Sequence, residues 1–178
     1  WKSAADAGNA FYITSLSTRT IVYKGMVLSG NLSNYYLDLQ DERAESALAL
    51  VHQRFSTNTF PSWRLAQPFR YLCHNGEINT IEGNRNWAKA RQNVLSTPLI
   101  PELQDLEGVV NRTGSDSSSM DNMLELMVLG GMDVFRALRL IMPPAWQNDE
   151  LMDPELRAFY EYNSMHMEAW DGPAGMVP

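Results

Sequence analysis

The stretch His52–Arg91 reads HQRFSTNTFPSWRLAQPFRYLCHNGEINTIEGNRNWAKAR and carries most of the information in this chain. It contains two polar motifs, HQRFSTN and HNGEIN, which lie about twenty residues apart. Each motif follows a predicted strand and combines a charged or amide side chain with backbone that a small substrate can approach. This arrangement suits the binding of an amino acid.

The predicted strands lie in the first half of the chain. Phe11–Leu16 and Thr20–Tyr23 mix aromatic and β-branched residues, and the short gap between them suits a hairpin. Ala47–Phe55 begins as a nearly continuous apolar run, which is typical of a strand covered on both faces. Phe69–His74 is expected to be a further strand that ends at the turn-forming pair Asn75-Gly76.

Helical patterns dominate the second half. An apolar stripe rich in methionine has helical spacing; Ser115 or Asp116 suits its N-cap, and Gly130-Gly131 suits its end. We interpret this stripe as a core face. The other predicted helices are Ser29–Leu39, Thr80–Leu95, one that begins at Asp133 and stops at Pro143-Pro144, and one that begins at Asp153-Pro154 and stops at Asp171-Gly172-Pro173. Pro98–Arg112 is predicted to be mostly loop. Strands first and helices later favour an α+β fold.

The composition excludes several classes of protein. The 178 residues are 44% hydrophobic, as in a soluble globular domain, and no apolar run reaches the roughly 18–20 residues of a membrane span. A net charge of −7 disfavours a nucleic-acid partner. The densest basic group, Arg85, Lys89 and Arg91, is expected to form a solvated helix face. The single cysteine, Cys73, rules out an intramolecular disulfide, is interpreted as a core residue and favours a reducing compartment.

Four residues stand out as candidates for binding or catalysis. The guanidinium of Arg54 matches a carboxylate, either that of a ligand or that of a structural salt bridge. Asn75-Gly76 forms either an ordinary tight turn or an oxyanion hole, in which the Asn amide and the Gly N–H converge on one oxygen. Asp116 is either a helix N-cap or a carboxylate that receives an ammonium group. Together these groups would match glutamine. His74, beside the turn, is interpreted as a packing residue rather than as a base.

The longest motifs resemble a known family. The segments FYITSLSTRTIVYKGM, HQRFSTNTFPSW, HNGEINTIEGNRNWAKAR, GSDSSSMDNMLELMVLGG and FYEYNSMHMEAWDGPA resemble the type 2 glutamine amidotransferase domain of the glutamate synthase large subunit. The resemblance runs from Asn9 to Ala174 and is weakest in Ser29–Arg43 and Pro98–Arg112. The alternatives are another type 2 amidotransferase, such as a purine or glucosamine pathway enzyme, and a non-catalytic amino-acid-binding module of the same fold.

The resemblance implies an N-terminal-nucleophile hydrolase fold, in which two antiparallel sheets lie between helical layers, with residues 1–178 as one incomplete domain. It implies that Arg54 binds the α-carboxylate of glutamine, that Asp116 binds its α-ammonium group, and that Asn75 and Gly76 form the oxyanion hole. It further implies that the ammonia released reacts with 2-oxoglutarate elsewhere in the full-length protein, with FMN and an iron–sulfur cluster. A small reductase subunit or ferredoxin would donate electrons, in the cytoplasm or in a plastid.

The catalytic cysteine of that family is the first residue of the mature protein, whereas residue 1 here is Trp. We therefore expect the chain to be an interior part of the domain. We also expect a polypeptide of residues 1–178 to release no ammonia from glutamine, because no N-terminal thiol is present to attack the amide. An assay of ammonia release by the purified polypeptide tests this, and turnover above a heat-inactivated control would contradict it.

Overall fold

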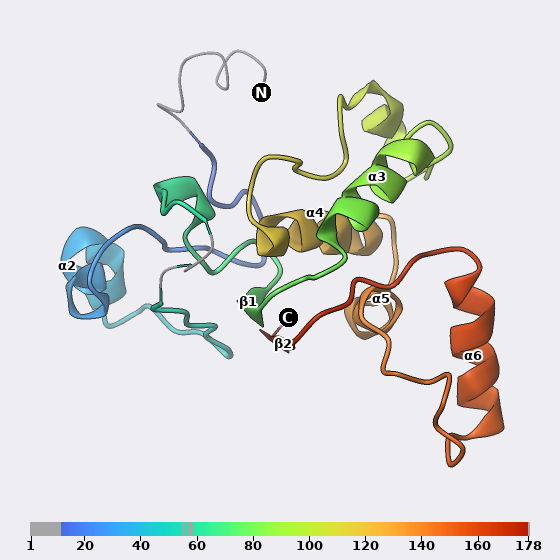
Figure 1. The fold of residues 1–178 in the computed structure, drawn as a ribbon. Coiled ribbons are helices and arrows are strands. Elements are labelled where there is room, and N and C mark those ends of the chain that lie inside the picture. Colours follow the sequence, from blue (N-terminus) through green and yellow to red (C-terminus); the bar gives the residue numbers. More distant parts are fainter. Residues whose placement is uncertain (1–11, 55, 57–58, 178) are drawn as a thin grey trace. The chain divides into compact units, whose positions relative to one another are not determined.

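The computed structural model describes residues 12–54, 56 and 59–177 (Figure 1). The chain divides into two compact units, Trp1–His74 with Val177 and Asn75–Met176 with Pro178. Phe11, the first residue of one predicted strand, and Phe55, the last residue of another, lie outside the described residues. Thr57 and Asn58 of the first polar motif do so too.

The first unit contains short helical turns rather than long elements. They are η1 (Ser29–Asn31), α2 (Leu32–Tyr35), η2 (Leu37–Gln40) and η3 (Trp63–Leu65). Aromatic contacts join them, because the ring of Tyr35 lies 4.9 Å from that of Tyr36 and 5.6 Å from that of Trp63. The Tyr36 hydroxyl donates a 2.6 Å hydrogen bond to the carbonyl oxygen of Lys24. The helix predicted over Ser29–Leu39 is therefore confirmed in part, as separate turns.

The three strand predictions before residue 56 are wrong wherever the structure describes them. Residues 12–16, Thr20–Tyr23 and residues 47–54 contain no strand. The apolar run that was expected to be covered on both faces is open to solvent, with Leu48 68% exposed and Val51 80% exposed. A strand is stabilised by hydrogen bonds to a neighbouring strand, and local sequence does not specify that neighbour.

Within the described ranges, the sheet consists of β1 (Cys73–Gly76) and β2 (Ala174–Val177). The pairing continues past β1, since Glu77 donates to the Pro173 carbonyl and Asn79 to the Asp171 carbonyl. Residue numbers increase along one segment, from 77 to 79, while those of its partners decrease from 173 to 171, so the pair is antiparallel. The strand predicted over Phe69–His74 begins later than expected and includes Asn75-Gly76. The predicted order, with strands first and helices later, is wrong for β2, which follows the helices that the structure describes.

The helices of the second unit confirm the predicted helices, except that the last one ends at Ser164, well before the predicted stop at Asp171-Gly172-Pro173. They are α3 (Ile81–Arg91), α4 (Asp116–Leu129), α5 (Val134–Ile141) and α6 (Pro154–Ser164), with a 3₁₀ turn, η4 (Pro101–Asp105), in the predicted loop. Asp133 and Asp153 cap α5 and α6 through their carboxylates, which accept backbone N–H groups of the first turn. Such caps satisfy donors that have no partner inside the helix.

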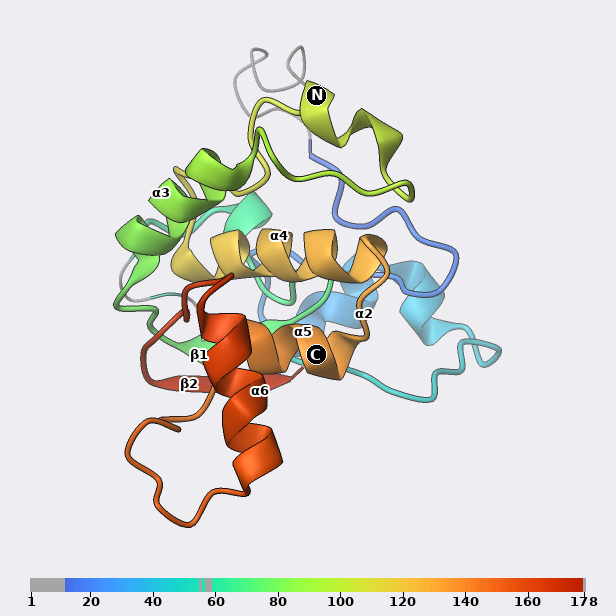
Figure 2. The same ribbon diagram turned by 90° about the vertical axis from the view of Figure 1, so that its right-hand side faces the viewer.

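The core of the second unit lies where α4 packs against α5 and α5 against α6 (Figure 2). Met120, Met123 and Leu124 of the predicted stripe are buried, which confirms that this face belongs to the core. Trp170, beyond the end of α6, is fully buried and donates its backbone N–H to the Ile141 carbonyl at 2.8 Å. The segment that leads to β2 is thereby attached to α5.

Two expectations about individual side chains have different outcomes. Cys73 is buried, as predicted for a core cysteine. Arg85, in contrast, is only 9% exposed, so the basic group on α3 is not a uniformly solvated face. Arg91 forms an ion pair with Glu168, whereas Lys89 is exposed. In the part of the chain that the structure describes, no helix is both long and apolar enough to cross a bilayer.

Candidate active site

The turn Asn75-Gly76 lies at the end of β1, and both residues are exposed. Gly76 has a φ of 154°, a backbone conformation that residues with a side chain rarely adopt. A Cβ atom at this position would lie 1.8 Å from the carbonyl oxygen of Pro173. Glycine is therefore required here both by its dihedral angle and by the close approach of the neighbouring segment.

The sheet also orients the amide of Gly76. Successive N–H groups of a strand point to opposite edges, and the N–H of Glu77 points toward the β2 side, where it donates to Pro173 at 2.9 Å. The N–H of Gly76 consequently points away from β2. An exposed amide with this orientation is available to a ligand on the other edge, as the oxyanion-hole interpretation of this turn requires.

Asp116 is the first residue of α4, and Ser115 is its N-cap, with the Ser115 side chain accepting from the Ser118 N–H at 3.1 Å. The N-cap interpretation of Asp116 is thus wrong. One carboxylate oxygen of Asp116 instead accepts the N–H of Ile78 at 2.8 Å, and the other accepts the N–H of Ser117 at 2.7 Å. Asp116 therefore joins the start of α4 to the segment that follows Asn75-Gly76.

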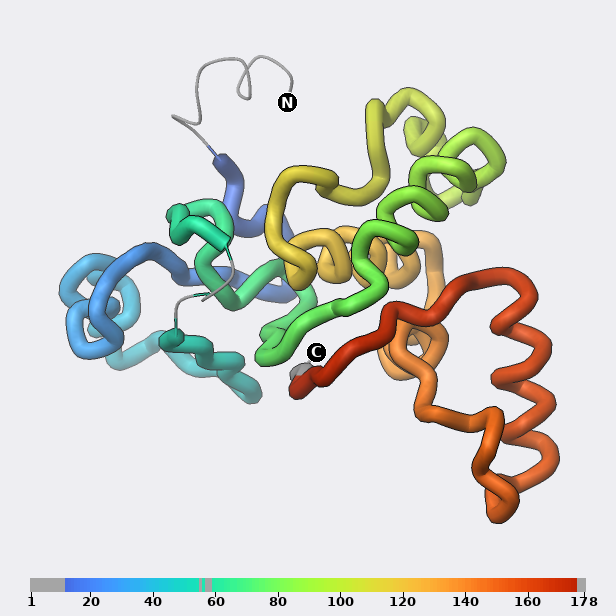
Figure 3. The backbone as a smooth tube through the Cα atoms, in the orientation of Figure 1, coloured from blue at the N-terminus to red at the C-terminus, as the bar shows by residue number. Residues whose placement is uncertain are grey.

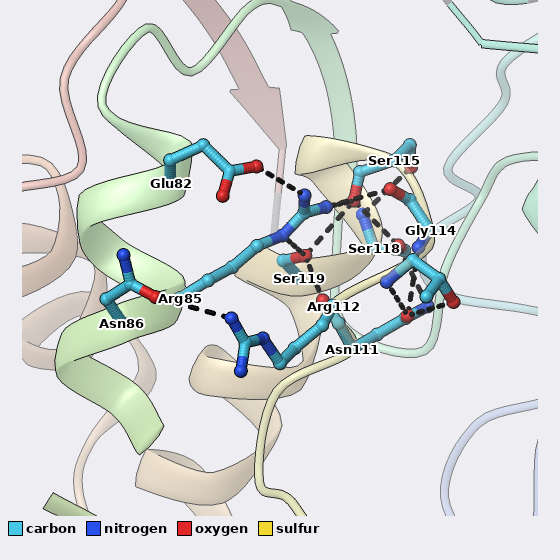
Figure 4. Close-up of polar contacts among 10 residues, drawn as sticks. Glu82, Arg85, Asn86, Asn111, Arg112, Gly114, Ser115, Ser118 and Ser119 are labelled. Carbon is cyan, nitrogen blue, oxygen red and sulfur yellow. Dashed lines mark hydrogen bonds and ion pairs between the residues drawn. The ribbon is translucent and has the colours of Figure 1, made fainter. Parts of the chain in front are cut away.

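A buried arginine fixes the loop that precedes Asp116 (Figure 4). The guanidinium of Arg85 donates to the Ser119 hydroxyl at 3.0 Å and to the Gly114 carbonyl at 2.8 Å, and it lies 3.4 Å from a carboxylate oxygen of Glu82. The side-chain oxygen of Asn111 accepts the N–H of Gly114 at 2.9 Å. This network connects α3 to the turn before α4 and restrains the position of the Asp116 backbone.

The candidate residues fall in both units. Asn75, Gly76 and Asp116 belong to the second unit, and the Asp116–Ile78 hydrogen bond connects the carboxylate to the turn. Arg54 belongs to the first unit, where its side chain is exposed in a segment without regular structure. Its convergence with the other three residues stays a prediction.

His74 is 2% exposed, in agreement with a packing residue. Its backbone N–H donates to the side-chain oxygen of Gln67 at 2.7 Å, and its carbonyl accepts from the side-chain nitrogen of the same glutamine at 2.8 Å. Gln67 thus pairs with the backbone of His74 much as a neighbouring strand would. This pairing holds the start of β1 in an extended conformation.

One segment near the turn was not expected from the sequence. Asp171 and Pro173 hydrogen-bond with the residues that follow Gly76, although Asp171-Gly172-Pro173 was predicted only as a helix stop. A Gly-Pro pair beside an Asp is a common terminator, so the local pattern gave no sign of a role at a distant turn.

The chain does not fit a cysteine-ligated iron–sulfur cluster. It contains one cysteine, whereas such clusters are held by four Cys thiolates. Among the described residues there is also no group of three His, Cys, Asp or Glu side chains that could hold a metal ion.

The Asp116 carboxylate and the exposed, glycine-dependent turn thus lie in one unit and are joined through the Ile78 N–H. Residues 2–178 match the family of class-II glutamine amidotransferases, and the chain belongs to this family. The match covers both units.

The chain is similar to glutamate synthases from bacteria, fungi and algae. It is 48% identical over 170 residues to the NADPH glutamate synthase large chain of Bacillus subtilis and 49% identical over 166 residues to the NADH glutamate synthase of Schizosaccharomyces pombe. It is 45% identical over 175 residues to the ferredoxin-dependent glutamate synthase of Antithamnion sp.. These alignments cover 95%, 92% and 97% of this chain, but only 11%, 8% and 11% of the respective relatives. The chain therefore spans about a tenth of their length.

Proposed function

We propose that this chain binds L-glutamine and stabilises the transition state for hydrolysis of its side-chain amide, as part of the glutaminase domain of a glutamate synthase. The observation that carries the proposal is the orientation of the Gly76 amide. It points away from β2 at an exposed turn, and Asp116 is attached to that turn by the Ile78 N–H.

The proposed reaction is acyl transfer through a thioester. A thiolate of the intact protein forms a bond to the amide carbon, and the amide oxygen becomes negatively charged. The Asn75 side-chain amide and the Gly76 N–H stabilise this oxygen. The C–N bond then breaks, ammonia leaves after protonation, and water hydrolyses the thioester to give glutamate. Cys73 is buried, so the proposed nucleophile is not assigned to it.

The α-ammonium and α-carboxylate groups of glutamine would each be bound by a side chain of opposite charge. Asp116 receives the α-ammonium group at the N-terminus of α4, where it also satisfies Ile78. Arg54, exposed and beside the first polar motif, pairs with the α-carboxylate through its planar guanidinium. The family match over residues 2–178 supports these assignments, because both motifs lie inside the matched region.

Further proposals concern the whole protein. We infer that both units belong to one domain with the αββα sandwich of N-terminal-nucleophile hydrolases. The ammonia would pass to a second site and react there with 2-oxoglutarate, and FMN and an iron–sulfur cluster would be held by other parts of the polypeptide. Relatives that are named NADPH-, NADH- and ferredoxin-dependent support a reductase subunit or ferredoxin as the electron donor.

The direct test is an assay of the intact protein for ammonia release from L-glutamine, with L-asparagine as the comparison substrate. Asparagine carries the same amide on a side chain that is one methylene shorter. We expect turnover of glutamine and at least tenfold lower kcat/KM with asparagine. Arg54 and Asp116 hold the α-carbon and the pair Asn75-Gly76 holds the amide oxygen, so the distance between the α-carbon and the amide is fixed. The absence of glutamine hydrolysis would overturn the proposed function.

A substitution at Arg54 separates binding from catalysis. In the intact protein we expect Arg54→Ala to raise KM for glutamine about 10- to 100-fold, because a charge-assisted hydrogen bond contributes roughly 1.5–3 kcal/mol. We expect kcat to change less than about threefold, since the α-carboxylate does not change charge during the reaction. Steady-state kinetics of glutamine hydrolysis measure both parameters.

Arg19→Ala is the matched control, because Arg19 is an exposed arginine of the same unit. We expect its KM to equal that of the unmodified protein. An Arg54→Ala protein with an unchanged KM would remove Arg54 from the binding site.

A further inference from the structure

The four residues after the candidate oxyanion pair are held in an unusual way. Each of the backbone N–H groups of residues 77–80 has an acceptor on a distant segment. Glu77 donates to the Pro173 carbonyl at 2.9 Å, and Asn79 and Thr80 donate to the Asp171 carbonyl at 2.7 and 3.4 Å. The N–H of Ile78 donates to the Asp116 carboxylate at 2.8 Å.

The segment Ala169–Pro173, here called the brace, supplies three of these four acceptor contacts. Figure 3 shows it as the red tube that runs beside the green tube between β1 and α3. Each of these hydrogen bonds restrains the backbone of residues 77–80. The brace therefore determines where the chain goes immediately after Gly76.

Side chains attach the brace to α3. The backbone N–H of Asp171 donates to the Thr80 hydroxyl at 2.9 Å, and that hydroxyl donates to the side-chain oxygen of Asn84 at 2.7 Å. The side-chain nitrogen of Asn84 then donates to the Ala169 carbonyl at 3.0 Å, and Asn84 is 1% exposed. This relay, which is anchored on the buried Asn84, attaches the brace to the start of α3.

Gly172 permits the close contact between the two segments. A Cβ atom at Gly172 would lie 1.8 Å from the carbonyl oxygen of Glu77 and 3.0 Å from the Asn79 nitrogen. Both neighbours are backbone atoms, which cannot rotate away as a side chain does. An alanine here forces the brace and residues 77–79 apart, next to the amide of Gly76.

We propose that the brace is a positioning element for the oxyanion pair Asn75-Gly76, with Gly172 and Thr80 as its positioning residues. The inference rests on the proposed function. Donors of an oxyanion hole act only when they are held within about 0.5 Å of the productive geometry. Gly76 precedes a residue whose N–H and carbonyl both contact the brace, so displacement of Glu77 displaces the Gly76 amide.

The test uses glutamine hydrolysis by the intact protein. We expect Gly172→Ala to lower kcat about 100-fold, because a misplacement of about 1 Å reduces catalysis by that order. We expect KM to stay within about threefold, since neither Arg54 nor Asp116, which are proposed to bind the α-carboxylate and the α-ammonium group, is altered. Gly83→Ala is the matched control with unchanged kcat, because a Cβ at this α3 position meets nothing within 4 Å.

A second pair of variants decides the matter if Gly172→Ala does not fold. Thr80→Val removes the hydroxyl that accepts the Asp171 N–H and donates to Asn84, whereas Thr80→Ser retains it. We expect kcat to fall about tenfold in Thr80→Val and to be restored in Thr80→Ser, with KM unchanged in both. A merely structural role would lower the amount of active protein in Thr80→Val without changing kcat per active site, as titrated with a glutamine-like covalent inhibitor.

The possible results separate the two proposals. A protein that does not hydrolyse glutamine overturns the proposed function. A protein whose kcat falls in Asn75→Ala but not in Gly172→Ala or Thr80→Val supports the proposed function and overturns the positioning role of the brace. A fall in kcat in all three, with wild-type KM and rescue by Thr80→Ser, supports both.

Discussion

Asn75→Ala is expected to lower kcat for glutamine hydrolysis by the intact protein about 100- to 1000-fold, equivalent to roughly 3–4 kcal/mol of transition-state stabilisation. The side-chain amide of Asn75 is one of two proposed donors to the oxygen that becomes negative when the thiolate attacks. This charge is absent in the bound substrate, so the lost hydrogen bond belongs mainly to the transition state. We therefore expect KM to change less than about threefold.

Steady-state measurement of ammonia release tests this expectation. Asn148→Ala is the matched control, because Asn148 is an exposed asparagine in a loop of the same unit, outside every contact described above. It should leave both parameters unchanged. An Asn75→Ala protein with the kcat of the unmodified protein would exclude Asn75 from the oxyanion hole and would leave the tight turn as its only role.

Two substitutions at Asp116 should have different effects, because its carboxylate has two proposed partners. In Asp116→Asn the amide oxygen can still accept the N–H of Ile78, but the negative charge that would bind the substrate ammonium group is lost. We expect KM to rise about 10- to 100-fold with kcat nearly unchanged. In Asp116→Ala the acceptor for Ile78 is lost too, so we expect the same rise in KM and a fall in kcat of roughly tenfold.

The difference between the two variants is the informative quantity. Asp105→Asn and Asp105→Ala are matched controls, because Asp105 is an exposed aspartate at the end of η4, in the same unit. Equal kcat values for Asp116→Asn and Asp116→Ala would show that the Ile78 hydrogen bond does not help to position the turn. An unchanged KM in both would remove Asp116 from the recognition of the ammonium group.

The helices of the second unit could be predicted because their signals are local. Helix α4 was predicted from a cap at Ser115 or Asp116, an apolar stripe at helical spacing and a glycine pair at its end, and each of these acts within one or two turns. The caps Asp133 and Asp153 are equally local. The secondary structure of such residues depends little on contacts with distant parts of the chain.

The strands could not be predicted in the same way. Ala47–Phe55 has the composition of a buried strand, yet Leu48 and Val51 are largely exposed. β2 was not anticipated, because the run AGMV carries no alternating pattern of its own. Its pairing partner lies about a hundred residues earlier in the chain. A ladder needs two segments, and composition identifies at most one of them.

The candidate site shows the same division. The residue types made Arg54, Asn75, Gly76 and Asp116 candidates, and the family resemblance favoured their binding roles over a salt bridge, an ordinary turn and an N-cap. They did not show that Asp116 holds the N–H of Ile78, or that Gly172 allows the brace to lie against Glu77. Those contacts join residues about forty and ninety-five positions apart.

The order of residues by itself thus determined the helices, their caps and the chemical types of the candidate groups. Each of these depends on side chains within a few positions of one another. Only the tertiary structure decided which backbone amides are occupied and which way the Gly76 amide points, because hydrogen bonds between remote segments fix both. Backbone amides are alike in every residue except proline, so their partners are set by folding and not by the identity of the side chain.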